Sequence, residues 1–145
     1  MCKHAKREKL SWSAICESVE LINLPSSAPH PVTLVAVERG GIIPAALIQR
    51  RVPSSRLEVV NLDQLPHVLF PYNSPHVWII DDVYDSGKTL ELVHTYYPRA
   101  IYFTLFNKQI NAPAWLTWCN WCDPSTWLEF PWESINRSIG GPAHD

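Results

Sequence analysis

The stretch from residue 77 to residue 90 constrains the fold more than any other part of this sequence. Four apolar residues, 77–80, lead directly into a pair of acids, Asp81 and Asp82, and a polar turn then opens a helix expected to begin near Leu90. An uninterrupted apolar run of this kind is typical of a strand buried on both faces of a parallel sheet. Because open α/β sheets bind ligands at the carboxyl ends of such strands, the two acids lie where a site is expected.

The turn after the acids has the composition of an anion-binding loop, because its backbone N–H groups can converge on a phosphate at a helix N-terminus. Its residues are Asp85, Ser86, Gly87, Lys88 and Thr89. Acids and turn together predict a site for a metal ion and a phosphate. A P-loop is excluded, because that motif requires glycine where Asp82 stands. A plain strand-to-helix turn with solvated acids is the alternative.

Composition indicates a single ordinary globular domain. The chain has 145 residues, 46% of them apolar, and a net charge of −2, so nothing in its overall charge favours nucleic acid or membrane partners. A basic run at residues 3–9 is interpreted as a solvated tail, with a contact to nucleic acid as the alternative. No apolar segment follows it, so neither a signal peptide nor a membrane span is predicted.

The cysteines are expected to be reduced and structural, as in a cytoplasmic protein. They are Cys2, Cys16, Cys119 and Cys122. Cys119 and Cys122 have the spacing of a zinc-binding pair, but no second pair lies nearby and the segment has the character of a strand.

Strands and helices alternate along the rest of the chain, which predicts βαβ units and a parallel sheet. Helices are predicted at 11–24, 44–51 and 90–97, and strands at 32–37, 57–62, 77–80 and 100–106. A second glycine loop follows the strand at 32–37: Arg39, Gly40 and Gly41 offer a guanidinium fork and a closely approaching backbone to a polyanion. A plain tight turn is the alternative for this loop.

Taken in order, these motifs resemble the type I phosphoribosyltransferases. The family signature is an apolar strand, two acids, two spacer residues and then Asp-Ser-Gly-x-Thr, as at residues 77–89. The loop at 39–41 resembles the family's pyrophosphate loop, although Glu38 replaces the serine of the xanthine-guanine branch. Residues 127–133, Trp-Leu-Glu-Phe-Pro-Trp-Glu, resemble the base-pocket motif of that branch. The matches cover roughly residues 10–133 in a constant order.

The resemblance implies the fold of that family: a mostly parallel sheet of about five strands flanked by helices, with a short C-terminal hood that carries the base pocket. It divides the single domain, residues 1–145, into a core at 10–110, a hood at 111–133 and a tail at 134–145. Relatives are dimers or tetramers, so a homo-oligomer is expected.

The resemblance also implies a purine salvage reaction. The phosphoribosyl group of 5-phosphoribosyl pyrophosphate (PRPP) would pass to a 6-oxopurine, guanine or xanthine above all, and Mg²⁺ would be the cofactor. By family motif, the ribose and the metal ion are expected to bind to Asp81 and Asp82. The 5′-phosphate is expected to bind to Asp85, Ser86, Gly87, Lys88 and Thr89. The pyrophosphate is expected to bind to Arg39, Gly40 and Gly41. Asp85 is the expected general base, and Lys108, Trp127, Leu128 and Glu133 are expected to bind the purine.

Two departures from the family pattern favour a rival hypothesis. Glu38 adds negative charge where a diphosphate is expected, and residues 63–75 are short for the loop that closes over the reaction centre, with Tyr72 as the one candidate for its aromatic residue. The rival is a non-catalytic protein of the same fold that binds PRPP or a nucleotide and regulates an RNA or another protein. An enzyme acting on a pyrimidine is disfavoured by Lys108 and the Trp127 motif.

Overall fold

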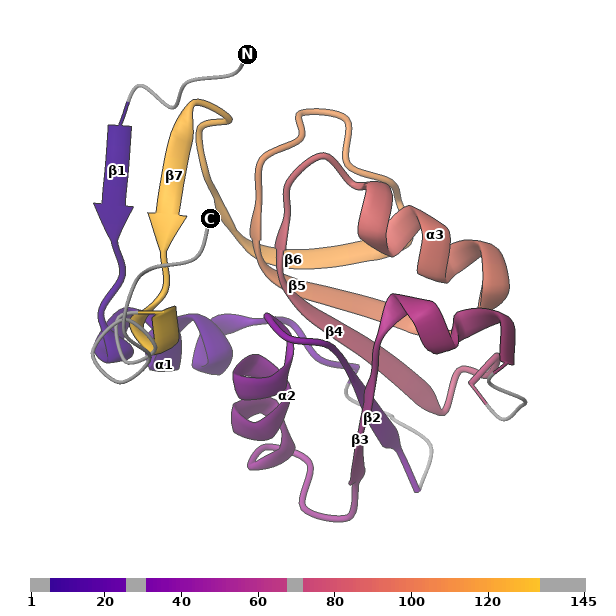
Figure 1. The fold of residues 1–145 in the computed structure, drawn as a ribbon. Helices are drawn as coiled ribbons and strands as arrows, with labels where there is room; N and C mark the ends of the chain where they lie inside the picture. Colours follow the sequence, from indigo (N-terminus) through magenta and orange to yellow (C-terminus); the bar gives the residue numbers. More distant parts are fainter. Residues whose placement is uncertain (1–5, 26–30, 68–71, 134–145) are drawn as a thin grey trace.

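A computed structural model describes residues 6–25, 31–67 and 72–133. Five parallel strands form the main sheet in the order β3-β2-β4-β5-β6 (Figure 1). They are β2 (Thr33–Val37), β3 (Arg56–Val60), β4 (Val77–Tyr84), β5 (Ile101–Asn107) and β6 (Leu116–Trp121). The predicted α/β class and the sheet of about five parallel strands are confirmed. The tail from residue 134 and Cys2 lie outside the described residues.

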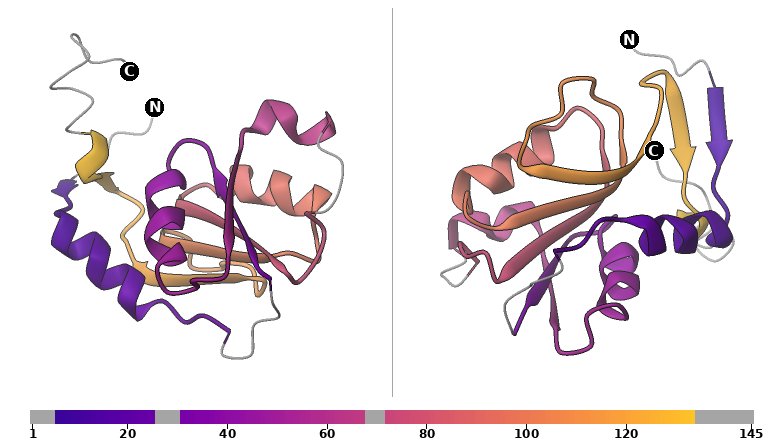
Figure 2. Two further views of the ribbon diagram at one scale, coloured as in Figure 1. Left: turned by 90° about the horizontal axis from the view of Figure 1, so that it is seen from below. Right: turned by 180° about the vertical axis from the view of Figure 1, so that it is seen from behind.

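Helices cover both faces of this sheet (Figures 1 and 2). They are α1 (Trp12–Leu21), α2 (Ile42–Gln49), α3 (Lys88–Tyr96) and a 3₁₀ helix, η1 (Leu62–His67). One core cluster joins α1 and α2 to the sheet, and a second joins α3 and η1 to the opposite face. No helix in the described part of the chain is long and apolar enough to cross a membrane.

The central strand β4 is buried on both faces, as its apolar run predicts. Trp78 and Ile80 belong to the cluster beneath α1 and α2, whereas Val77 and Ile79 belong to the cluster beneath α3. Alternate residues of a strand point to opposite faces, so each half of the run fills one of the two cores. β4 continues through the acid pair to Tyr84, which is four residues further than the apolar run alone indicates.

The hood is a separate two-stranded sheet in which β1 (Lys6–Lys9) pairs in parallel with β7 (Thr126–Glu129). It lies apart from the main sheet in both Figure 1 and Figure 2. Two expectations need correction here. Residues 6–9 of the basic run form a paired strand rather than a frayed tail, and residues 116–121, expected in the hood, form the edge strand β6 of the main sheet.

Candidate active site

Asp81 and Asp82 lie in the last four residues of β4, at the carboxyl edge of the sheet. Asp81 Oδ1 accepts the N–H of Asp82 at 2.8 Å, and Asp82 Oδ1 accepts the N–H of Val83 at 2.7 Å. Burial raises the pKa of Asp81 well above its ordinary value, and the neighbouring Asp82 raises it further. Burial also raises the pKa of Asp82. Within the described residues neither carboxylate has an ion-pair partner, so two acids share a low-dielectric edge without a cation.

The glycine loop between β2 and α2 rests directly on this acid pair. A Cβ on Gly40 would come 2.6 Å from Cγ of Asp82, and a Cβ on Gly41 would come 2.9 Å from the backbone nitrogen of Val37. Only glycine therefore permits the approach. The peptide between Glu38 and Arg39 is cis, and the side chains of both residues are exposed at the loop surface. The loop thus brings its glycine backbone against the acids and leaves the Arg39 side chain exposed to solvent.

The turn after β4 forms a small pocket at the start of α3. Gly87 has φ 89°, a conformation that L side chains rarely adopt, and it is the N-cap of the helix. The pocket encloses about 60 Å³ and is lined by Val83, Tyr84, Asp85, Ser86, Gly87, Thr89 and Leu90. Ser86 Oγ accepts the N–H of Lys88 at 3.3 Å, which holds the turn closed over the helix start. A helix N-terminus and a pocket of this size suit a phosphate.

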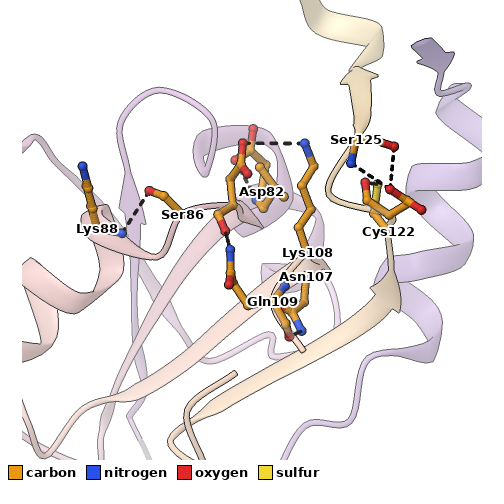
Figure 3. Close-up of polar contacts among 11 residues, drawn as sticks. Asp82, Ser86, Lys88, Asn107, Lys108, Gln109, Cys122 and Ser125 are labelled. Atoms are coloured by element: carbon orange, nitrogen blue, oxygen red, sulfur yellow. Dashed lines mark hydrogen bonds and ion pairs between the residues drawn. The ribbon is translucent and has the colours of Figure 1, made fainter. Parts of the chain in front are cut away.

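Lys108 is not the solvated strand cap that its position alone would suggest. Its side chain is 3% exposed, and Nζ lies 3.6 Å from Oδ2 of Asp85, whose side chain is 58% exposed. In Figure 3 the Lys108 side chain extends from the end of β5 between Asp82 and the turn that carries Cys122 and Ser125. The geometry therefore pairs a buried cation with an accessible carboxylate between the acid pair and the hood.

The hood places its tryptophan and its leucine on opposite faces of β7. Leu128 is buried in the core, whereas Trp127 is 40% exposed and lies beside Arg7 in the register of the two strands. Glu133 follows β7, and its Oε1 accepts the N–H of Phe130 at 2.7 Å. Burial is the main cause of the raised pKa of Asp82, and the charge of Glu133 adds a smaller rise to that pKa.

Sequence identity to curated proteins shows the family to which this chain belongs. The chain is 32% identical to a xanthine-guanine phosphoribosyltransferase of Cereibacter sphaeroides over 69% of its own length and 68% of that protein. It is 30% identical to a xanthine-guanine phosphoribosyltransferase of Roseobacter denitrificans over 90% of its length and 87% of the relative. The chain belongs to the type I phosphoribosyltransferases, in the purine branch.

The fold agrees with this membership, although no family model matches the sequence. The structure of a purine phosphoribosyltransferase from Pyrococcus horikoshii superposes with a TM-score of 0.67 at 21% identity. The superposition covers 96% of this chain and 98% of that one. At this identity the likeness supports the fold alone, and it extends over nearly the whole phosphoribosyltransferase domain.

A divalent cation suits the acid pair of this phosphoribosyltransferase. The buried Asp81 and the half-buried Asp82 supply hard oxygen ligands, and a bound cation would favour the ionised form that their raised pKa values disfavour. No group of three or more His, Cys, Asp or Glu side chains among the described residues is arranged to hold a metal ion. Asp81 and Asp82 can therefore supply two ligands at most, which is the pattern of Mg²⁺ bound jointly by carboxylates and substrate oxygens.

Three residues close to Lys108 were missed by sequence reasoning: Asn107 at the end of β5, Gln109 just after it and Cys122 just after β6. Gln109 Nε2 donates to the backbone carbonyl of Asp85 at 2.5 Å, and the buried Asn107 shapes the turn around Lys108. Cys122 is buried near Lys108, where burial raises the pKa of the thiol and the ammonium group opposes that rise. No family motif includes these residues, and only the strand order brings them to this edge.

Tyr72, the candidate lid residue, is part of the core of the phosphoribosyltransferase. Its ring packs edge-on against Tyr97 with centroids 5.5 Å apart, and its hydroxyl donates to Glu58. Tyr97 ends α3 and Tyr72 precedes β4, so both lie toward the amino ends of the strands, away from the acids. Residues 68–71 of the expected lid lie outside the described residues.

The remaining cysteine prediction concerns Cys119 on the edge strand. Cys16, Cys119 and Cys122 are free thiols, and burial raises the pKa of Cys119. Cys119 lies on β6 and Cys122 directly after it, in agreement with the strand character of this segment.

Proposed function

We propose that this protein transfers the phosphoribosyl group of PRPP to a 6-oxopurine, releasing pyrophosphate and the nucleoside 5′-monophosphate. Guanine and xanthine are the favoured bases, and hypoxanthine is a further candidate. The observation that carries the proposal is the contact between Lys108 and Asp85 at 3.6 Å, beside the phosphate pocket and below the hood. The names of the curated relatives, xanthine-guanine phosphoribosyltransferases, support the same choice of base.

PRPP would be held at three points along the carboxyl edge. The pocket of residues 85–89 takes the 5′-phosphate, and the loop of Arg39, Gly40 and Gly41 takes the pyrophosphate. Between them, Asp81 and Asp82 take the ribose hydroxyls and the metal ion. These anchors fix C1 of the ribose relative to the incoming base, which converts an encounter of two molecules into an oriented reaction. When bound, Mg²⁺ neutralises the diphosphate and so improves it as a leaving group.

The base would react through its imidazole nitrogens. A bond forms between N9 and C1 while the bond from C1 to the pyrophosphate oxygen breaks, and pyrophosphate leaves with that electron pair. Asp85 accepts the proton from N7 as general base. Its exposed carboxylate can be reached by a substrate, and the Lys108 ammonium group beside it would donate a hydrogen bond to the 6-oxo group. An adenine would instead turn its amino group toward that cation, which disfavours it.

The hood would complete the base site. The exposed face of Trp127 stacks on the purine, and the backbone carbonyl of Leu128 contacts the 2-substituent. The sequence assigned Glu133 to that substituent too. Its Oε1 accepts the N–H of Phe130, a bond that holds the Glu133 side chain close to the end of β7.

The regulatory rival predicts binding without turnover. Two features favour catalysis over it: the general-base candidate Asp85 remains accessible, and Lys108 is buried at a cost that a nucleotide sensor without base chemistry would not require. Glu38 is still exposed in the pyrophosphate loop, and nothing in the structure explains it.

Release of pyrophosphate tests the proposal directly. Purified protein is incubated with PRPP and Mg²⁺, and guanine, xanthine, hypoxanthine, adenine, uracil or orotate is added in separate reactions. Release with oxopurines alone is the expected result, and the relative rates give the preferred base. Silence with all six bases, together with calorimetric binding of PRPP, would refute the enzyme and establish the regulatory rival.

A further inference from the structure

The turn after β5 is closed by a side chain that has no assigned role. Asn107 is fully buried, and its amide bonds the backbone of Gln109 twice: Nδ2 donates to the carbonyl of Gln109 at 2.9 Å, and Oδ1 accepts the Gln109 N–H at 2.9 Å. Lys108 lies between the two residues. The paired bonds therefore fix the backbone on both sides of the lysine.

Two backbone bonds tie this turn to the neighbouring strands. The Lys108 N–H donates to the carbonyl of Tyr84 at the end of β4, at 3.0 Å, and the Cys122 N–H donates to the carbonyl of Asn107 at 2.9 Å. The ends of three strands are thus joined at one point (Figure 3). A turn held this way has little freedom to move Lys108 relative to the acid pair.

Gln109 also connects this turn to Asp85, the residue whose carboxylate pairs with Lys108. Its Nε2 donates to the backbone carbonyl of Asp85 at 2.5 Å, while Lys108 Nζ lies 3.6 Å from the carboxylate of the same residue. Gln109 therefore holds the backbone of Asp85, and Lys108 contacts its side chain. Its carboxylate is more than half exposed, so these contacts, rather than burial, define its position.

We propose that Gln109 is a positioning residue for the transfer reaction, which keeps the carboxylate of Asp85 at a fixed separation from the ammonium group of Lys108. The inference rests on the proposed function, in which Asp85 receives the N7 proton and Lys108 binds the 6-oxo group. N7 and the 6-oxo oxygen are fixed relative to each other in one rigid purine. Asp85 and Lys108 must therefore keep a constant spacing for both contacts to form at once. Gln109 acts only through Asp85 and touches no substrate.

The bond also sets the orientation of one peptide in the phosphate turn. The carbonyl of Asp85 and the N–H of Ser86 belong to the same trans peptide and point in opposite directions. Holding the carbonyl toward Gln109 directs the Ser86 N–H away from β5. The main effect of losing Gln109 falls on the base, because the remaining residues of the phosphate turn keep their contacts.

Gln109→Met tests the proposal, since methionine keeps the length of the side chain but has no N–H to donate. Gln49 provides a matched control: its Nε2 also donates to a backbone carbonyl, that of Ser55 at 3.1 Å, at the end of α2 remote from the acids. We expect Gln109→Met to lower kcat/KM for guanine about tenfold, with KM for PRPP changed less than about twofold and with the same melting temperature as Gln49→Met.

A second measurement reports the contact independently of turnover. The ¹³C resonance of the Asp85 carbonyl is expected to move upfield in Gln109→Met and to stay unchanged in Gln49→Met. An unmoved resonance would overturn the contact, and a moved resonance with unchanged kcat/KM for guanine would overturn the positioning role. Wild-type protein that turns over no base would refute the proposed function itself, and the role of Gln109 in it, whereas the resonance would still show whether the contact exists.

Discussion

The residues of the candidate site differ most in the solvent exposure of their side chains. Asp85 is exposed and available to a substrate, whereas Asp81 and Lys108 are buried at the same edge of the sheet. The order of the motif predicted that Asp81 and Asp85 lie at the carboxyl end of a strand, whereas Lys108 was predicted from the family resemblance. Gln109 and Cys122 were not predictable, since their contacts depend on which strands become neighbours rather than on any local pattern.

Asp85→Asn is expected to lower kcat by about 100-fold or more, because an amide cannot accept the N7 proton. PRPP should bind as before, since the backbone of the phosphate turn is unchanged. Steady-state kinetics with guanine gives the first quantity, and calorimetry with PRPP and Mg²⁺ gives the second. Turnover equal to wild type would remove Asp85 as the general base.

Asp81→Asn is expected to stabilise the protein in the absence of ligands. An acid whose pKa is higher in the folded state destabilises that state as pH rises above its ordinary pKa, and the loss is complete once pH exceeds the folded pKa. The neutral amide escapes this loss and still accepts the N–H of Asp82. Thermal unfolding at pH 7.5 in a chelator should show a melting temperature higher by about 3 °C, equivalent to about 1 kcal/mol.

The gain from Asp81→Asn should disappear near pH 4, where the wild-type carboxyl is protonated as well. Mg²⁺ with PRPP should raise the melting temperature of wild type more than that of the variant, because the variant lacks one proposed metal ligand. A variant that melts below wild type at both pH values would contradict the electrostatic account of the acid pair.

At the scale of elements, the sequence predicted each strand of the main sheet except β6 as a distinct unit, and it predicted each helix of the described chain apart from η1. Periodicity failed at the ends of elements, where hydrogen bonding decides the boundary. β4 runs on through the polar pair because its neighbour β5 continues the ladder to Tyr84, whereas the pairing with β2 ends at Ile80. The loop that rests on those acids is fixed by packing rather than by its own turn preference.

Gly40→Ala is expected to raise KM for PRPP at least tenfold. Its Cβ would come 2.6 Å from Cγ of Asp82, so the proposed pyrophosphate loop or the Asp82 carboxylate must shift and the spacing between them changes. We expect a loss of about 1–3 kcal/mol in the free energy of unfolding from the same overlap. Glu38→Ala serves as the control in this loop, because it removes a charge and adds no atom against Asp82. A KM for PRPP in Gly40→Ala equal to that in Glu38→Ala would contradict the packing argument.

The whole molecule joins segments that lie far apart in the sequence. β1 pairs with β7 in the register Arg7 to Trp127, and the N–H of Leu10 donates to the carbonyl of Glu129 at 2.8 Å. Four exposed residues with no alternation of apolar and polar side chains carry no local strand signal, which is why the sequence did not predict β1. The strand exists because β7 offers it a backbone edge.

Removal of residues 1–9 is expected to raise KM for guanine at least tenfold while PRPP binding is kept, because β7 would lose the partner that holds Trp127 in place. The full-length variant with alanine at Lys6, Arg7 and Lys9 keeps the backbone pairing and removes only charge, so it should behave as wild type. Equal loss of guanine affinity in both variants would assign the effect to the basic side chains instead of the strand.

The parallel pairing of β1 with β7 has a consequence for the order in which the protein is made. Strands β2 to β5 and both phosphate loops lie between the two hood strands in the chain, so they emerge from the ribosome before β7 exists. β1 must therefore wait for β7 before the two strands can pair. Their pairing closes a loop of more than a hundred residues. During that interval a chain can assemble the proposed phosphate loops and the strand end that carries Lys108 before it has the strand that carries Trp127.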